Sequence, residues 1–222
     1  MNIVFRTTAC AALLATGLGL AAGIANAADT VTMHGDPDAA RPYWSQQTLD
    51  DCMLMAVADV VGQTTGHAPT EDEIVDRATQ TRSHFHAGAV YTVPADVDDP
   101  ATWNDVSAED TTVLLASYGI DSTYTDDDVQ AAGGLATGLP ALEGYLDNGR
   151  DAIVFVNAEA LWNSDGDRST GDHAVVVTGV DTANGVVHLN DSGPEDGCDE
   201  RVPVATFEAA WAAGDHGLTV TG

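Results

Sequence analysis

Four residues of this sequence could together carry out nucleophilic catalysis at a carbonyl group. Cys52 stands where the first strongly apolar helix is expected to begin, and a helix N-terminus favours the reactive thiolate. His173 opens a predicted strand, and Asp191 closes the next one, where it could accept a hydrogen bond that fixes the imidazole tautomer. Gln46, six residues before Cys52, could donate its side-chain amide to a developing oxyanion. The set predicts a cysteine-dependent acyl-transfer site.

The apolar pattern predicts the elements that would position these residues. We expect helices over 52–63, 70–78, 107–118, 140–146 and 206–212, and strands over 152–157, 173–180, 186–190 and 202–204. Helices first and an antiparallel sheet afterwards make an α+β domain, with the N-terminal helices packed on the C-terminal sheet. Residues 29–43 and 81–106 are expected to be irregular, and the acidic tract 126–128 to be a solvated loop.

The loop between the two predicted C-terminal strands decides whether His173 and Asp191 can meet. A two-residue turn at Asn184-Gly185 would place Asp191 on the opposite face of the sheet from His173. A five-residue loop over 181–185 would bring Asp191 to the same face, one diagonal step away. We therefore expect the longer loop, or a bulge with the same effect.

Composition and charge exclude several classes of partner. The chain has 222 residues, with 35 Asp and Glu against 7 Lys and Arg, so its formal net charge is −28. The hydrophobic content of 44% is that of a globular protein and excludes a disordered acidic tail. So few basic residues exclude a nucleic-acid-binding face and disfavour an anionic membrane surface. Neutral or cationic partners are favoured.

The N-terminus has the pattern of an export signal. Arg6 precedes an apolar run over 9–24, and Ala25-Asn26-Ala27 supplies the small residues that a signal peptidase requires. A retained membrane anchor is the alternative, but the run is short and rich in glycine. We expect cleavage after Ala27 and a secreted or extracytoplasmic protein, with a signal peptide over 1–27, an irregular segment over 28–42 and one domain over 43–222.

Removal of this signal would leave two cysteines, Cys52 and Cys198, in an oxidising compartment. Two such cysteines often form a disulfide, which would make the chain a stapled binding domain without catalytic activity. A free Cys52 thiol near His173 would instead make it an enzyme. The redox state of Cys52 therefore separates the two classes.

The residues around the four candidates follow a known pattern. It consists of Tyr43-Trp44-Ser45-Gln46 with Asp51-Cys52, of Asp172-His173 with the apolar run to Gly179, and of Leu189-Asn190-Asp191. In these residues the sequence resembles the bacteriocin-processing cysteine peptidases, family thirty-nine of the cysteine peptidases in the papain-like clan, over about residues 43–212. Better-known members cut leader peptides after a double glycine and are fused to ABC transporters, and this sequence resembles a free-standing exported branch.

The resemblance implies a papain-like fold and hydrolysis of a peptide or protein substrate. It implies no cofactor for this reaction. It assigns Cys52 as nucleophile, His173 as base, Asp191 as orienting acid and Gln46 as oxyanion donor. One departure is Met53, which stands where the family usually has glycine and is expected to crowd the substrate channel. The other is that Asp191 lacks the proline that usually follows it. A cell-wall amidase of the NlpC type is an alternative, although those enzymes usually place the histidine much nearer the cysteine.

Two further groups have weak metal-binding patterns. Residues 163–169 alternate polar and acidic side chains as in a calcium loop, but Arg168 and Ala174 stand where its glycine and glutamate are needed. His84 and His86 lack further ligands at regular spacing. We expect a solvated acidic loop, surface histidines and no metal.

Overall fold

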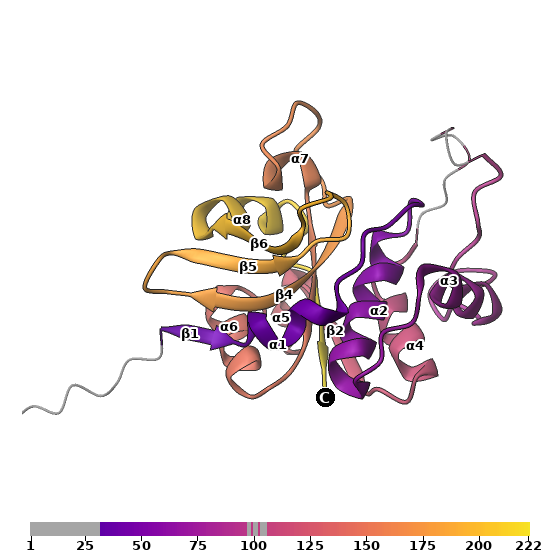
Figure 1. The fold of residues 1–222 in the computed structure, drawn as a ribbon, viewed down its shortest axis with the longest axis horizontal. Coiled ribbons are helices and arrows are strands. Elements are labelled where there is room, and N and C mark those ends of the chain that lie inside the picture. Colours follow the sequence, from indigo (N-terminus) through magenta and orange to yellow (C-terminus); the bar gives the residue numbers. More distant parts are fainter. Residues whose placement is uncertain (1–31, 97–98, 100–101, 103–105) are drawn as a thin grey trace, which may run out of the picture. The chain divides into compact units, whose positions relative to one another are not determined.

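An antiparallel sheet of seven strands forms the centre of the described chain (Figure 1). The structure is a computed structural model that describes residues 32–96, 99, 102 and 106–222; the predicted signal peptide over 1–27 lies outside these ranges. The strand order is β2-β7-β3-β4-β5-β6, and β1 pairs with the far end of β4. The strands are β1 Met33–Gly35, β2 Ser122–Thr125, β3 Ala152–Val156, β4 His173–Asp181, β5 Val186–Asn190, β6 Cys198–Pro203 and β7 Leu218–Thr221.

Helices cover both faces of this sheet. They are α1 Pro37–Ala40, the 3₁₀ turn η1 Arg41–Tyr43, α2 Cys52–Thr65, α3 Glu71–Gln80, α4 Asp110–Ser117, α5 Asp127–Ala131, α6 Leu139–Asp147, α7 Ala158–Leu161 and α8 Val204–Ala212. The predicted α+β class is confirmed. None of the helices in the described ranges has the length and apolar character that crossing a membrane requires.

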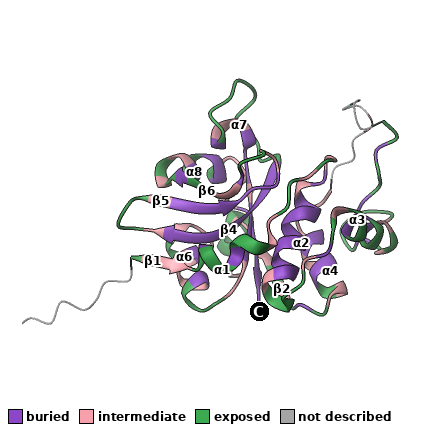
Figure 2. Cartoon of the chain, viewed as in Figure 1, coloured by how far each residue is buried: buried purple, intermediate pink, exposed green. Residues whose placement is uncertain are grey.

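The central strands are apolar on both faces because each face packs against helices. Along β4, Ala174 and Val176 join the core formed with α2, α3 and α4, whereas Val175 and Val177 join the core formed with α6 and α8. This explains why β4 is a continuous apolar run rather than an alternating one. Figure 2 shows α2 and the central strands as the most buried elements.

Helix α2 is the most buried helix, and its ends are set by local sequence. Ten of its 14 residues are buried. It ends where Gly66 adopts a left-handed conformation (φ 81°) and donates its N–H to the Gly62 carbonyl. It begins at Cys52, after Asp51, whose side chain makes no capping hydrogen bond. Cys52 is thereby fixed at the N-terminus of a helix anchored in the core.

The β4–β5 hairpin confirms the register expected from the sequence. Its loop, 182–185, is one residue shorter than the five-residue loop considered above. A bulge at Thr178 supplies the missing residue, because the pairing register shifts between Val177 and Gly179. The end of β5 is therefore paired as the longer loop would pair it, and Asp191 follows on the same face as His173.

Several short elements differ from the expectation of irregular chain. The segment over 29–43 contains β1, α1 and η1, and the acidic tract is not a solvated loop, because α5 begins within it. Asp126 caps α5 by accepting the N–H of Val129. Asn157 caps α7 in the same way. These helices have five and four residues, too few to show a helical period in the sequence.

Candidate active site

Cys52 lies at the first turn of α2 with a partly exposed side chain. The aligned peptide dipoles of a helix favour negative charge at this end, as a reactive thiolate requires. The next residue, Met53, is 6% exposed and packs into the core on the α2 side of the sheet. The expectation that Met53 crowds the substrate channel is therefore wrong, because its side chain points into the protein.

His173 and Asp191 form a buried pair beside this helix end. The Nε2 of His173 lies 2.7 Å from Asp191 Oδ1, and both side chains are at least nine-tenths buried. Asp191 Oδ1 also accepts the Gly193 N–H at 2.8 Å. The Cys52 thiol is close enough to the imidazole for its charge to act on the ring. Because Nε2 is directed to Asp191, Nδ1 is the nitrogen left for the thiol.

The charges of this site favour a protonated histidine. Burial lowers the pKa of His173, but the negative charge of Cys52 and the hydrogen bond with Asp191 outweigh burial and raise that pKa well above its ordinary value. Burial likewise opposes the charge of Asp191, but its hydrogen bonds with His173, Gly193 and Trp162 hold its pKa below the usual range. The arrangement therefore favours an imidazolium paired with the Asp191 carboxylate.

Trp162 covers the histidine–aspartate pair, and the sequence did not assign it there. Its ring centroid lies 5.0 Å from that of His173, and its Nε1–H donates to Asp191 Oδ2 at 2.8 Å. The indole is nevertheless 42% exposed. Trp162 received no role from the sequence, because nothing in its spacing links it to His173.

The segment that carries Gln46 is attached to the loop after Asp191. Trp44 donates its Nε1–H to the Asp191 carbonyl, and the Gln47 N–H donates to the Ser192 carbonyl. Gln46 is exposed, and its amide lies 3.3 Å from the Gly193 carbonyl. These contacts bring the first and last parts of the predicted site together. Gln46 is thereby held on the surface beside the loop after Asp191, with its amide donating to the Gly193 carbonyl.

Two carboxyl groups missed by the sequence analysis lie around this pair. Burial and the negative charges of Asp191 and Asp196 raise the pKa of Glu200 to about 7. Burial, with the nearby charge of Glu159, raises the pKa of Asp172, which precedes His173. The surroundings of the imidazole are therefore acidic.

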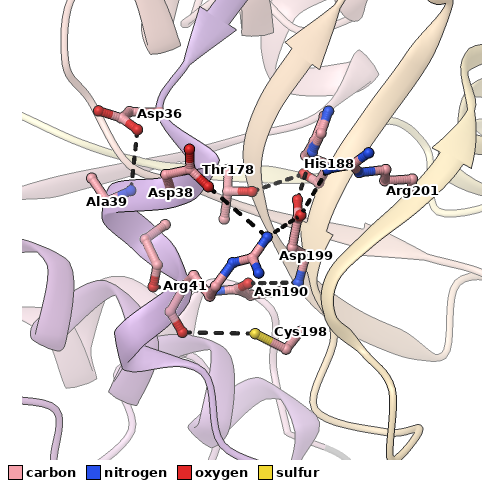
Figure 3. Close-up of polar contacts among 11 residues, drawn as sticks. Asp36, Asp38, Ala39, Arg41, Thr178, His188, Asn190, Cys198, Asp199 and Arg201 are labelled. Atoms are coloured by element: carbon pink, nitrogen blue, oxygen red, sulfur yellow. Dashed lines mark hydrogen bonds and ion pairs between the residues drawn. The ribbon is translucent and has the colours of Figure 1, made fainter.

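Cys198 lies apart from Cys52, and both thiols are free. Figure 3 shows Cys198 on β6 facing η1, where its Sγ lies 3.8 Å from the Arg41 carbonyl oxygen. Next to it, Asp199 accepts hydrogen bonds from Arg41 and His188 at 2.5 and 2.6 Å. The disulfide that would staple a binding domain is absent from the described structure.

The weak metal patterns have other roles. His86 Nε2 lies 3.0 Å from Asp110 Oδ2, so this histidine ties its loop to the start of α4. In the loop over 163–169, Arg168 points back to Asn163 and Ser164. Among the described residues, no cluster of three or more histidine, cysteine or acidic side chains could hold a metal ion.

The sequence and the fold are similar to those of known proteins. The model of the Peptidase_C39 like family matches residues 40–216. Uncharacterized proteins of Mycobacterium tuberculosis and Mycobacterium bovis are 48% identical over 225 residues, covering 98% of this chain and 96% of theirs. The crystal structure assigned as a C39-like peptidase from Bacillus anthracis has a TM-score of 0.59 at 14% identity, covering 86% of this chain and 97% of that one. A double glycine motif protease from a transporter, in complex with the leader peptide, has a TM-score of 0.46 at 13% identity, with 80% and 88% coverage.

Proposed function

Because the chain belongs to the Peptidase_C39 like family and has an α+β, papain-like fold, we propose that it is an exported cysteine peptidase. In this proposal Cys52 is the nucleophile, His173 the general base and acid, and Asp191 the group that orients the imidazole. The observation that carries it is the 2.7 Å contact between His173 Nε2 and Asp191 Oδ1, which leaves Nδ1 available for the thiol at the start of α2.

The chemistry follows from these positions. The Cys52 thiolate attacks the peptide carbonyl carbon and forms a carbon–sulfur bond, and the carbonyl oxygen becomes an oxyanion. The Gln46 amide donates to that oxyanion. The His173 imidazolium gives its Nδ1 proton to the leaving amine, and the neutral imidazole then takes a proton from water, which hydrolyses the thioester. Asp191 stays ionised throughout and holds the imidazole in place.

Alanine and asparagine variants test these roles on an unstructured peptide substrate. Cys52→Ala is expected to abolish hydrolysis, and His173→Ala to reduce it nearly as much, because the two residues act as a unit. Asp191→Asn is expected to be milder. Circular dichroism and the melting temperature serve as the folding controls. Hydrolysis at the wild-type rate by Cys52→Ala would contradict the proposal.

Gln46 and its neighbour Gln47 provide a matched pair for the oxyanion role. Gln46→Ala should cost roughly 2–4 kcal/mol of transition-state stabilisation and leave stability unchanged, since its amide is exposed. The Gln47 side chain instead holds the local structure, because it accepts a hydrogen bond from Ser192 Oγ and donates one to the Leu49 carbonyl. Gln47→Ala should therefore lower the melting temperature. A kcat unaffected by Gln46→Ala would remove this residue from the mechanism.

A further inference from the structure

Asp51, the residue before Cys52, has a buried carboxyl group that no hydrogen-bond donor reaches. Its side chain is 2% exposed, and both carboxyl oxygens are buried without a hydrogen-bond partner. Its backbone carbonyl accepts the N–H groups of Leu54 and Met55, so the residue is fixed to the first turn of α2. A buried carboxylate without a donor is costly, because its charge loses hydration without compensation.

Glu71 is the carboxyl group whose charge acts on Asp51, and its own oxygens accept three hydrogen bonds. Glu71, the first residue of α3, accepts the N–H groups of Thr48 and Leu49 at Oε1, at 2.5 and 3.0 Å. Its Oε2 accepts the Thr48 hydroxyl at 2.7 Å. A carboxyl group has about four acceptor sites, so one on Oε2 remains open to a further donor. The loop between Gln46 and Cys52 is therefore held by Glu71, on α3.

The groups around Asp51 do not neutralise a negative charge. Glu71 on α3 and Asp50 on the preceding loop both raise the pKa of Asp51, after burial, and together these effects bring it to about 7. The Tyr91 hydroxyl is close enough to interact with Asp51, and it donates to the Asp50 carbonyl at 3.4 Å. Within the described ranges no set of three ligands could place a metal ion there. A proton shared between the two carboxyl groups would let them lie close together without repelling each other.

We propose that Asp51 is a positioning residue that carries a proton at neutral pH and donates it in a hydrogen bond to Glu71. This bond would join the N-terminus of α2 to the loop over 46–50, and so fix the distance between Gln46 and the Cys52 thiol. The inference rests on the proposed peptidase function for its catalytic consequence, but not for the position of the proton.

Only the protonated form of Asp51 can donate the proposed hydrogen bond to Glu71. Below about pH 7 Asp51 is protonated and the link to Glu71 is present. As pH rises through that value, two carboxylates face each other in a buried site and repel, so the loop with Gln46 loosens. His173 loses its proton at a higher pH, because its pKa is well above the ordinary range. Its deprotonation therefore produces a separate limb of the pH profile of kcat.

The protonation state is tested directly by nuclear magnetic resonance. Protein labelled with carbon-13 at the aspartate carboxyl groups is titrated, and the Asp51 resonance is assigned as the one missing in Asp51→Asn. We expect this resonance to titrate near pH 7. Titration near the ordinary aspartate value, about 4, would overturn the proposal whether or not the protein hydrolyses peptides.

The positioning role is tested by the pH profile of kcat. Wild-type kcat should fall roughly tenfold from pH 6 to pH 8, as for one group titrating near 7. Asp51→Asn should flatten this fall, because its amide donates to Glu71 at every pH. Asp72→Asn removes an exposed carboxylate from the same helix as Glu71 and should keep the wild-type profile. An unchanged fall in Asp51→Asn would overturn the positioning role.

The two hypotheses fail in different ways. A wild-type protein that hydrolyses no peptide contradicts the peptidase function, and the carboxyl titration still decides where the proton lies. An active peptidase whose Asp51 resonance titrates near 4 keeps the function and loses the inference. Asp51→Ala cannot donate to Glu71 and should lower kcat at pH 6. Asp51→Asn can donate and should keep a kcat at pH 6 above that of Asp51→Ala.

Discussion

At the scale of single residues, the indole of Trp162 is the most informative contact of the proposed site. Its ring lies tilted against the His173 ring, and its N–H donates to Asp191 Oδ2. Trp162→Phe keeps an aromatic cover and removes the N–H donor. The pKa of Asp191 should then rise toward its ordinary value, because one of the hydrogen bonds that holds it down is lost. In the proposed mechanism Asp191 supports catalysis as a carboxylate, so this support disappears as pH falls through that pKa.

The acid limb of kcat in Trp162→Phe is therefore expected at a higher pH than in the wild type. A pH series of kcat measures this shift, and the reversibility of activity on return to neutral pH controls for acid unfolding. An acid limb that stays at the wild-type position would show that the Trp162 N–H does not set the protonation of Asp191.

The chemistry of these residues was more predictable from the sequence than their surroundings were. Cys52, His173 and Asp191 could be selected because each marks the beginning or end of a predicted element, and element ends meet at one edge of a sheet. Trp162 and Glu200 gave no such signal. Trp162 follows α7, which is too short to predict, and Glu200 lies in β6, of which the sequence predicted only the end.

At the scale of elements, Asn190 of β5 makes side-chain contacts with α1, α2 and β6 beneath the site. From the last position of β5 its side-chain amide donates to Asp59 of α2 at 2.7 Å and lies 3.3 Å from the Ala40 carbonyl of α1. Its Oδ1 accepts the Asp199 N–H of β6 at 3.3 Å (Figure 3). The network ties the helix of Cys52 to the strand that ends before Asp191.

Asn190→Ala should lower the free energy of unfolding on the order of 3 kcal/mol, because it leaves several buried polar groups without partners. Burial raises the pKa of Asp59 to about 7, so Asp59 loses its proton and needs a donor as pH rises. The loss should therefore be larger at pH 8 than at pH 5, measured by urea unfolding. Gln63→Ala removes the other donor to Asp59 from a partly exposed position and should cost about 1 kcal/mol. Equal losses in both variants at both pH values would contradict this role.

The limits of sequence-based prediction also appear at this scale. The apolar runs of β3, β4 and β5 are long enough to show buried strands, and the capping box of Thr70 and Glu73 marks the start of α3, where the structure confirms it. The strands β2 and β7 have four residues each and include several threonines, so neither shows an apolar run. They pair only with strands distant in sequence, and tertiary packing rather than local pattern makes them strands.

At the scale of the whole molecule, the excess of acidic residues should determine which peptides bind. The formal net charge is −28, and acidic groups, including Glu200 and Asp172, lie around the proposed site. A field of one sign concentrates substrates of the opposite sign and is screened by salt. We therefore expect kcat/KM to be higher for peptides with lysine or arginine near the cleaved bond than for matched peptides with glutamate.

Salt and a pair of variants separate this field from a general preference for certain side chains. For the lysine peptide kcat/KM should fall as ionic strength rises from 10 to 150 mM, since the screening length shortens from about 30 to about 8 Å. For a neutral peptide kcat/KM should change little.

Glu200→Gln, measured at pH 8 where this carboxyl is ionised, should weaken the preference for the lysine peptide. Glu208→Gln removes an equal charge from an exposed position on α8 and should weaken it less, because it lacks the local interaction that Glu200 has with His173 and Asp191. If the lysine and glutamate peptides respond equally to salt, the charge of the molecule does not select its substrate, and the acidic residues serve another purpose such as solubility.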